Sequence, residues 1–286
     1  MAAAVRYDLI EDVAVLTLDR PPVNASSAGL RRQLAAGLDR AAASAAVGVV
    51  IMGAHDTFIA GSDLTEFDEE VLPEPQLPAV IRTIEALPVP VVAALDGHAL
   101  GGGLELALAC DARVATARVV LGLPEVTLGM VPGAGGTQRL PRAIGRAAAL
   151  DMIVCDSRCD GVTARERGLV DEIAEPADLL SRACARSQVI GKRALLREPV
   201  PADPRDVLSD AVARATAVTR IHPNAGEAIR LVQCAGSGDA DTMLEDERAT
   251  FQRLRLSDEA RTLRERFFAE RRAARRLREN CPARRP

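Results

Sequence analysis

The sequence predicts an α/β fold with a mainly parallel sheet, followed by a helical C-terminal part. Two short apolar segments rich in β-branched residues, 47–52 and 90–95, are typical of strands that are buried on both faces. Each is preceded by a stretch with helical spacing of apolar residues, at about 29–43 and 79–87. Strands that alternate with helices require crossover connections, which favours parallel pairing.

The other elements follow from the same patterns. A glycine-rich segment comes after the strand at 90–95 and leads into an apolar helix. From about residue 143 onward the pattern is mainly helical. The remaining predicted elements are a strand at 13–18, the apolar helix ending near Cys110, and strands at 111–115 and 169–173.

The chain is expected to divide near residue 195. We predict a core domain at 1–195 and a helical C-terminal region at 196–286, because several prolines between 199 and 204 mark a boundary. The last stretch is rich in arginine. Phe267 and Phe268 lie within it, which predicts an amphipathic helix that docks by its apolar face.

Composition narrows the classes of function. The chain is 48% hydrophobic with a net charge of −4 and only 2% aromatic residues, so nucleic-acid binding is not expected. No apolar run approaches a membrane span, and the start of the chain has no signal-peptide pattern. Scattered cysteines without a second ligand pair indicate reduced thiols and no metal site. We therefore expect a cytoplasmic protein that does not contact membranes.

Three local features could carry chemistry. The glycine run 101–103 opens a helix, so its N–H groups and the helix dipole suit a developing negative oxygen. Glu105 lies among apolar residues in the first turn of that helix, and Glu125 is a lone carboxylate in an apolar loop. Singly, each also has an ordinary structural explanation as a dipole partner or a turn. A second glycine run, 133–136, lacks the spacing of a dinucleotide-binding loop.

Together, four segments resemble the enoyl-CoA hydratase/isomerase (crotonase) family. They are residues 20–24, 59–64, 90–110 and 121–142, and they stand in the family's order over a resemblance that covers about 7–195. The resemblance implies a crotonase-like ββα superhelix. Residues 245–271 are similar to the linker helices that follow the N-terminal hydratase domain of bifunctional fatty-acid oxidation enzymes.

The resemblance also implies a site. Glu105 is expected to act as the base on water, and Glu125 as the acid toward C2 of a trans-2-enoyl-CoA. The backbone N–H groups of Ser62 and Gly102 are expected to form the oxyanion hole; the family usually has alanine where Ser62 stands, which matters little for an amide donor. Other expected substrate-binding residues are Asn24, Ala25, Ala60, Gly61, Asp63, Leu64, Gly101, Pro124 and Gly133. No cofactor is implied, since CoA is part of the substrate.

The expected function is therefore a 2-enoyl-CoA hydratase, a lyase of fatty-acid β-oxidation. Alternatives are Δ3–Δ2 enoyl-CoA isomerisation, which needs only the carboxyl at Glu125, or another crotonase-type acyl-CoA reaction. A non-catalytic protein that binds through its basic C-terminal stretch is a further alternative. The family resemblance allows a homotrimer or hexamer, or a monomer, which the long C-terminal stretch favours.

Overall fold

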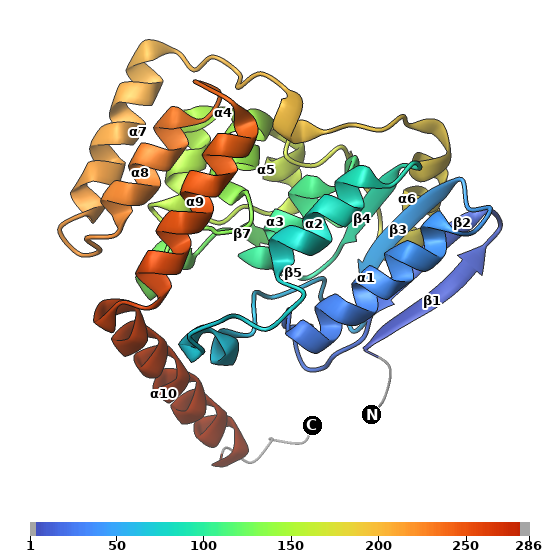
Figure 1. Cartoon of the computed structure of the whole chain (residues 1–286), viewed down its shortest axis with the longest axis horizontal. Coiled ribbons are helices and arrows are strands. Elements are labelled where there is room, and N and C mark those ends of the chain that lie inside the picture. Colours follow the sequence, from blue (N-terminus) through green and yellow to red (C-terminus); the bar gives the residue numbers. More distant parts are fainter. Residues whose placement is uncertain (1–3, 281–286) are drawn as a thin grey trace, which may run out of the picture.

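The computed structural model describes residues 4–280 and has an α/β architecture built on a six-stranded sheet (Figure 1). The strand order is β1-β2-β3-β4-β6-β8. Only β1 pairs antiparallel with its neighbour, and the other four pairings are parallel. The strands are β1 (Val5–Ile10), β2 (Val13–Leu18), β3 (Gly48–Gly53), β4 (Val91–Leu95), β6 (Ala112–Ala115) and β8 (Glu172–Ile173). The predicted fold class is confirmed.

Alternate residues of the central strands enter two separate apolar layers. In β3, Val49 and Ile51 join the larger core, whereas Val50 belongs to a smaller core on the other face. The larger core includes apolar residues of α1 (Ala28–Ala42), α2 (Leu77–Ala86) and α3 (Gly102–Ala109). On the opposite face, α6 (Leu179–Val189) packs Leu179 and Ala183 on the smaller core. Because side chains alternate along a strand, burial on both faces needs the continuous apolar runs seen in the sequence.

Several elements differ from the sequence prediction. The edge strand β1 was not predicted; its sequence VRYDLI alternates apolar and polar residues, which is a strand pattern, but it lacks the continuous apolar run of the inner strands. The strand expected at 169–173 is reduced to two residues in β8. The helix α4 (Gly136–Ile153) begins before residue 143, where the helical pattern was predicted to start. Pro141 and the non-helical Gly145 obscure its pattern in the sequence.

A second, two-stranded sheet was not predicted, and one of its strands lies in the glycine-rich segment that follows β4. Its strands, β5 (His98–Leu100) and β7 (Val120–Gly122), pair in parallel. Strand β5 leads directly into the glycine run and α3, and β7 leads into the short turn η2 (Glu125–Leu128). The pair therefore places the starts of α3 and η2 side by side.

The C-terminal helices return to the core. The helices α7 (Arg205–Val218) and α8 (Ala225–Cys234) pack on α4, and α9 (Ala240–Arg255) runs from α8 toward α10 (Asp258–Asn280), as Figure 1 shows. The shorter elements are η1 (Leu64–Asp68), α5 (Gly161–Glu166) and η3 (Leu195–Arg197). Residues 281–286 of the predicted C-terminal region lie outside the described residues. Within 4–280, no helix is both long enough and apolar enough to cross a bilayer.

Candidate active site

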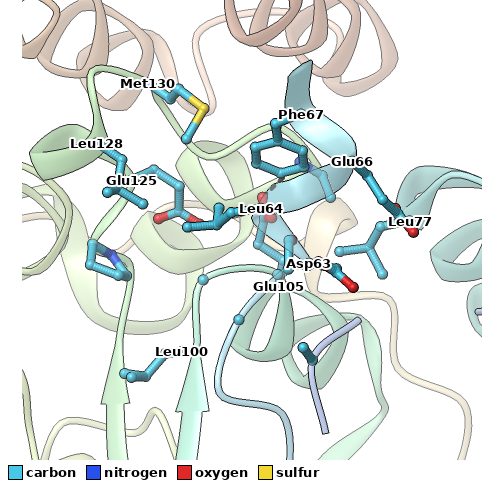
Figure 2. Close-up of a pocket in the computed structure, with 18 of the residues that line it drawn as sticks. Asp63, Leu64, Glu66, Phe67, Leu77, Leu100, Glu105, Glu125, Leu128 and Met130 are labelled. Atoms are coloured by element: carbon cyan, nitrogen blue, oxygen red, sulfur yellow. Dashed lines mark hydrogen bonds between the residues drawn. The ribbon is translucent and has the colours of Figure 1, made fainter. Parts of the chain in front are cut away.

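One cavity of about 300 Å³ gathers nearly all of the residues that the sequence analysis singled out (Figure 2). Its wall includes residues from the loop before α1, from η1, α2, α3 and η2, and from α9 and α10. The predicted site residues that line it are Ala25, Ala60, Gly61, Ser62, Asp63, Leu64, Gly101, Gly102, Glu105, Pro124, Glu125 and Gly133. Segments far apart in the sequence thus meet at one place.

Asn24 is the one predicted site residue that does not line this cavity. Its side chain is buried, and its Nδ2 donates to the carbonyl of Thr57 at 2.7 Å while its Oδ1 accepts from the N–H of Arg20 at 2.7 Å. These bonds tie the segment before α1 to the loop that follows β3. The structure therefore shows Asn24 supporting the loop behind the cavity wall.

The backbone N–H groups of Ser62 and Gly102 are both available on the cavity side. Ser62 forms a parallel bridge with Ser26, in which Gly61 accepts from Ser26 and Asp63 donates to it. In such a bridge the middle residue's own N–H points away from its partner. Gly102 is the first residue of α3, where an N–H has no partner within the helix. Among residues 4–280, neither N–H donates to another protein group.

Two glycines permit the close approach of these segments. A Cβ at Gly102 would lie 2.8 Å from both the Ser62 Oγ and a Leu77 methyl group. Gly101 has a φ of +53°, and a Cβ there would lie 2.9 Å from the Glu125 Oε1. The backbone conformation at Gly101 therefore favours glycine, and a side chain at either position would displace the Ser62, Leu77 or Glu125 side chains that line the cavity.

Glu105 is a buried carboxylate that accepts two backbone hydrogen bonds. It lies in the first turn of α3 and is 3% exposed, and its Oε1 accepts from the N–H of Ala134 at 2.7 Å and of Gly136 at 2.9 Å. Burial raises the pKa of Glu105, while these two amides and the charges of Arg139 and Arg248 act in the opposite direction. Its ionised form therefore has partners within the protein.

Glu125 has a different environment in the same cavity. It is the first residue of η2, and its Oε2 is buried without a hydrogen-bond partner among residues 4–280. Burial raises the pKa of Glu125 well above its usual value, and the negative charge of Glu105 raises it further. Figure 2 shows the two carboxyls entering the cavity from α3 and from η2. The site thus holds two buried carboxyls with raised pKa values, of which Glu125 is raised more strongly and keeps its proton more readily than Glu105.

The predicted site residues include none from the C-terminal helices. Arg248 and Phe251 of α9, and Phe267, Phe268 and Arg271 of α10, line the cavity. The prediction that the last helix docks by an apolar face through Phe267 and Phe268 agrees with this position. Nothing in the local pattern of α9 indicated that it would lie next to Glu105. In the described part of the chain, His, Cys, Asp and Glu side chains form no group of three suited to a metal ion.

Comparison with known proteins assigns the family. The family model described as enoyl-CoA hydratase/isomerase matches residues 9–198. The chain is 38% identical over 271 residues to the human peroxisomal bifunctional enzyme, and the match covers 91% of this chain and 37% of that protein. It is 36% identical over 281 residues to the Arabidopsis thaliana peroxisomal fatty acid beta-oxidation multifunctional protein AIM1, covering 91% of this chain and 39% of that protein.

A solved structure gives the same assignment. The crystal structure of an enoyl-CoA hydratase from Bacillus anthracis is 30% identical, with a TM-score of 0.60, and the match covers 89% of this chain and 92% of that one. The chain thus belongs to the enoyl-CoA hydratase/isomerase family and is an enzyme of the crotonase type. It spans less than two fifths of the length of the human and Arabidopsis relatives.

Proposed function

We propose that this chain is a 2-enoyl-CoA hydratase that adds water across the C2=C3 bond of a trans-2-enoyl-CoA in fatty-acid β-oxidation. The observation that carries the proposal is the presence in one cavity of two buried carboxyls that differ in their hydrogen-bond partners and in how far their pKa values are raised. Addition of water needs one group that accepts a proton and one that donates a proton. The name of the Arabidopsis relative, a peroxisomal fatty acid beta-oxidation multifunctional protein, supports a place in β-oxidation.

The environments assign the two roles. Glu105 accepts two amide hydrogen bonds, whereas the Glu125 Oε2 has no partner among residues 4–280. Because the charge of Glu105 contributes to the raised pKa of Glu125, Glu105 ionises first. The base is therefore Glu105 and the acid is Glu125, in agreement with the roles that the family resemblance implies.

The reaction then balances as an addition of water. Glu105 takes a proton from water while the water oxygen bonds to C3, and Glu125 gives its proton to C2. Negative charge that develops on the thioester oxygen is met by the N–H groups of Ser62 and Gly102, each worth about a hundred- to a thousandfold in rate. The proton on Glu105 must return to Glu125, directly or through water, before the next turnover.

The decisive experiment follows the loss of enoyl-thioester absorbance with crotonyl-CoA and with a longer trans-2-enoyl-CoA. Glu105→Gln and Glu125→Gln should each lower kcat by about a hundred- to ten-thousandfold while the protein stays folded. Glu175→Gln, an exposed glutamate outside the cavity, is the matched control and should retain activity. A folded wild type that binds CoA but hydrates no chain length would contradict the proposal.

The Glu125 carboxyl, whose Oε2 has no hydrogen-bond partner among residues 4–280, also favours Δ3–Δ2 enoyl-CoA isomerisation as a second activity. In its ionised form a single carboxyl can take a proton from C4 and then give that proton to C2, so this activity should rise with pH as Glu125 loses its proton. With a 3-enoyl-CoA, conjugated absorbance should appear, and it should persist in Glu105→Gln but vanish in Glu125→Gln. Loss of this activity to the same extent in both variants would assign both carboxyls to it.

A further inference from the structure

Two glutamates bind alternate N–H groups of one turn. The turn 133–137 leads into α4, and Glu105 accepts from its Ala134 and Gly136 amides. Glu247 of α9 accepts from the other two, Gly135 at 2.5 Å and Thr137 at 2.8 Å. Its Oε2 also accepts from the Thr137 hydroxyl at 2.5 Å. Four consecutive N–H groups are thus shared between a carboxyl of the cavity and a carboxyl from the C-terminal part of the chain.

The turn depends on these bonds for its shape. Gly135 has a φ of +104°, and the helix α4 that follows has no side-chain cap. The first N–H groups of a helix need partners from outside it, and negative charge is favourable there because of the helix dipole. Glu247 is only 1% exposed, so water does not replace it. Its carboxyl supplies the partners that the start of α4 otherwise lacks.

We propose that Glu247 is a positioning residue of this site, and this role rests on the proposed hydratase function. It holds the 133–137 turn so that the Ala134 and Gly136 N–H groups face Glu105. Through the turn its carboxyl is also coupled to the two carboxyls that line the cavity. Glu247 itself is not expected to touch the substrate.

Electrostatics gives this coupling a direction. Burial, with a further contribution from the charge of Glu105, raises the pKa of Glu247 to about 8, against the hydrogen bonds from Thr137 and Gly135. The charge of Glu247 in turn is among the causes that raise the pKa of Glu125. When Glu247 ionises, Glu125 therefore holds its proton to a higher pH. This widens the pH range in which the base is ionised and the acid is protonated.

The other charged groups near Glu247 are largely engaged with each other. Arg139 of α4 forms an ion pair with Glu85 of α2, and Arg197 of η3 pairs with Asp241. Arg248 of α9 donates to the Gly133 carbonyl at 3.2 Å and to the Gln76 side chain. The remaining charged side chains around α9 are Arg82 of α2, Glu245 on α9 itself, and Arg230 of α8, which pairs with Asp246.

The first test is the pH profile of kcat/KM in three variants. Glu247→Gln should lower kcat by about tenfold to a hundredfold with a smaller change in KM, because Glu105 is displaced. The basic limb of its profile should move to lower pH by roughly one unit, since a negative charge near Glu125 is lost. Glu247→Asp keeps the charge on a shorter side chain, so kcat should fall while the basic limb stays. Glu245→Gln, on the exposed side of the same helix, is the control and should match the wild type in both.

A Glu247→Gln enzyme with the wild-type profile would overturn the coupling, and one with wild-type kcat would overturn the positioning. If that variant does not fold, carboxyl 13C NMR of the wild type decides the matter. One buried glutamate should titrate near pH 8, and a second buried glutamate signal should shift at the same pH. Absence of any such response between about pH 6 and 9 would refute the proposal. This titration remains valid even if the wild type proves not to be a hydratase.

Discussion

At the scale of single residues, Glu105 and Glu125 show how two identical side chains acquire different chemistry. Both are buried in one cavity, and burial raises the pKa of each. Glu105 regains part of the lost solvation from the Ala134 and Gly136 amides, and Glu125 has no equivalent partner for its Oε2 within residues 4–280. The difference comes from the backbone around the carboxyls, which is where a general acid and a general base are usually separated.

A buried protonated Glu125 should make the protein less stable as pH rises. Its pKa is raised in the folded state, so the unfolded chain holds fewer protons above the ordinary glutamate pKa of about 4.3. The free energy of unfolding should then fall by up to about 1.4 kcal/mol per pH unit from this group, until the pH passes the folded-state pKa. Glu125→Gln removes the titration, so it should gain stability relative to wild type between about pH 5.5 and 8.

Urea unfolding of the wild type and of Glu125→Gln, at about pH 5.5 and about pH 8, measures this effect. The matched control is again Glu175→Gln, whose exposed side chain should leave the pH dependence unchanged. A stability difference between wild type and Glu125→Gln that is the same at both pH values would show that Glu125 is not held protonated.

At the scale of elements, hydrogen bonds from α9 hold the segment 67–70, which lies at the end of η1 beside the cavity. The guanidinium of Arg255 is 2% exposed and donates to the carbonyls of Phe67, Glu69 and Glu70 at 3.1, 2.6 and 2.7 Å. Phe67, at the end of η1, also meets Phe251 of α9 edge to face at 5.5 Å. The wall formed by η1 therefore depends on a helix nearly two hundred residues further along the chain.

Arg255→Met should release this loop. The three carbonyls lose a charged donor, which we expect to cost about 1–3 kcal/mol in the free energy of unfolding. Hydrogen exchange over residues 64–72 should become faster, and KM should rise more than kcat falls. Arg253→Met, at an exposed arginine that pairs with Glu227, is the control for loss of charge on α9. Equal exchange in the 64–72 segment of both variants would contradict the role of Arg255.

At the scale of the whole molecule, the C-terminal helices cover the cavity of their own chain. Phe267, Phe268 and Arg271 of α10 line the cavity. Gly129, which follows η2, packs closely against α10, since a Cβ there would lie 2.9 Å from the Cα of Ala260. In a trimer built through C-terminal helices, these helices would instead pack between subunits. The fold seen here completes the cavity wall within one chain.

We therefore predict that the protein is a monomer in solution. Light scattering coupled to size exclusion should give about the 30.3 kDa of a single chain at micromolar concentration. A truncation before α10 should lower CoA-thioester affinity without changing the measured assembly. A mass three or six times larger would instead support the trimer or hexamer that the family resemblance allows.

The sequence alone determined the inner strands, the helices that alternate with them, and the glycine run before Glu105. These features depend on local periodicity and on buried apolar runs, which a single sequence displays. Nearly all of the site residues that the family resemblance implies line the cavity, and Asn24 is the exception. The structure shows that the Asn24 side chain supports the loop behind the wall. The division at residue 195 remains a prediction.

Only the tertiary structure determined which partners surround each carboxyl. The exposed strand β1 and the two-residue length of β8 are defined by pairing with neighbouring strands, which a single sequence does not display. The contact of Glu247 with the turn that holds Glu105 joins α9 to the start of α4, and no local pattern encodes it. A pKa depends on burial and on neighbouring charges in space, so the division of acid and base between Glu105 and Glu125 follows from the fold.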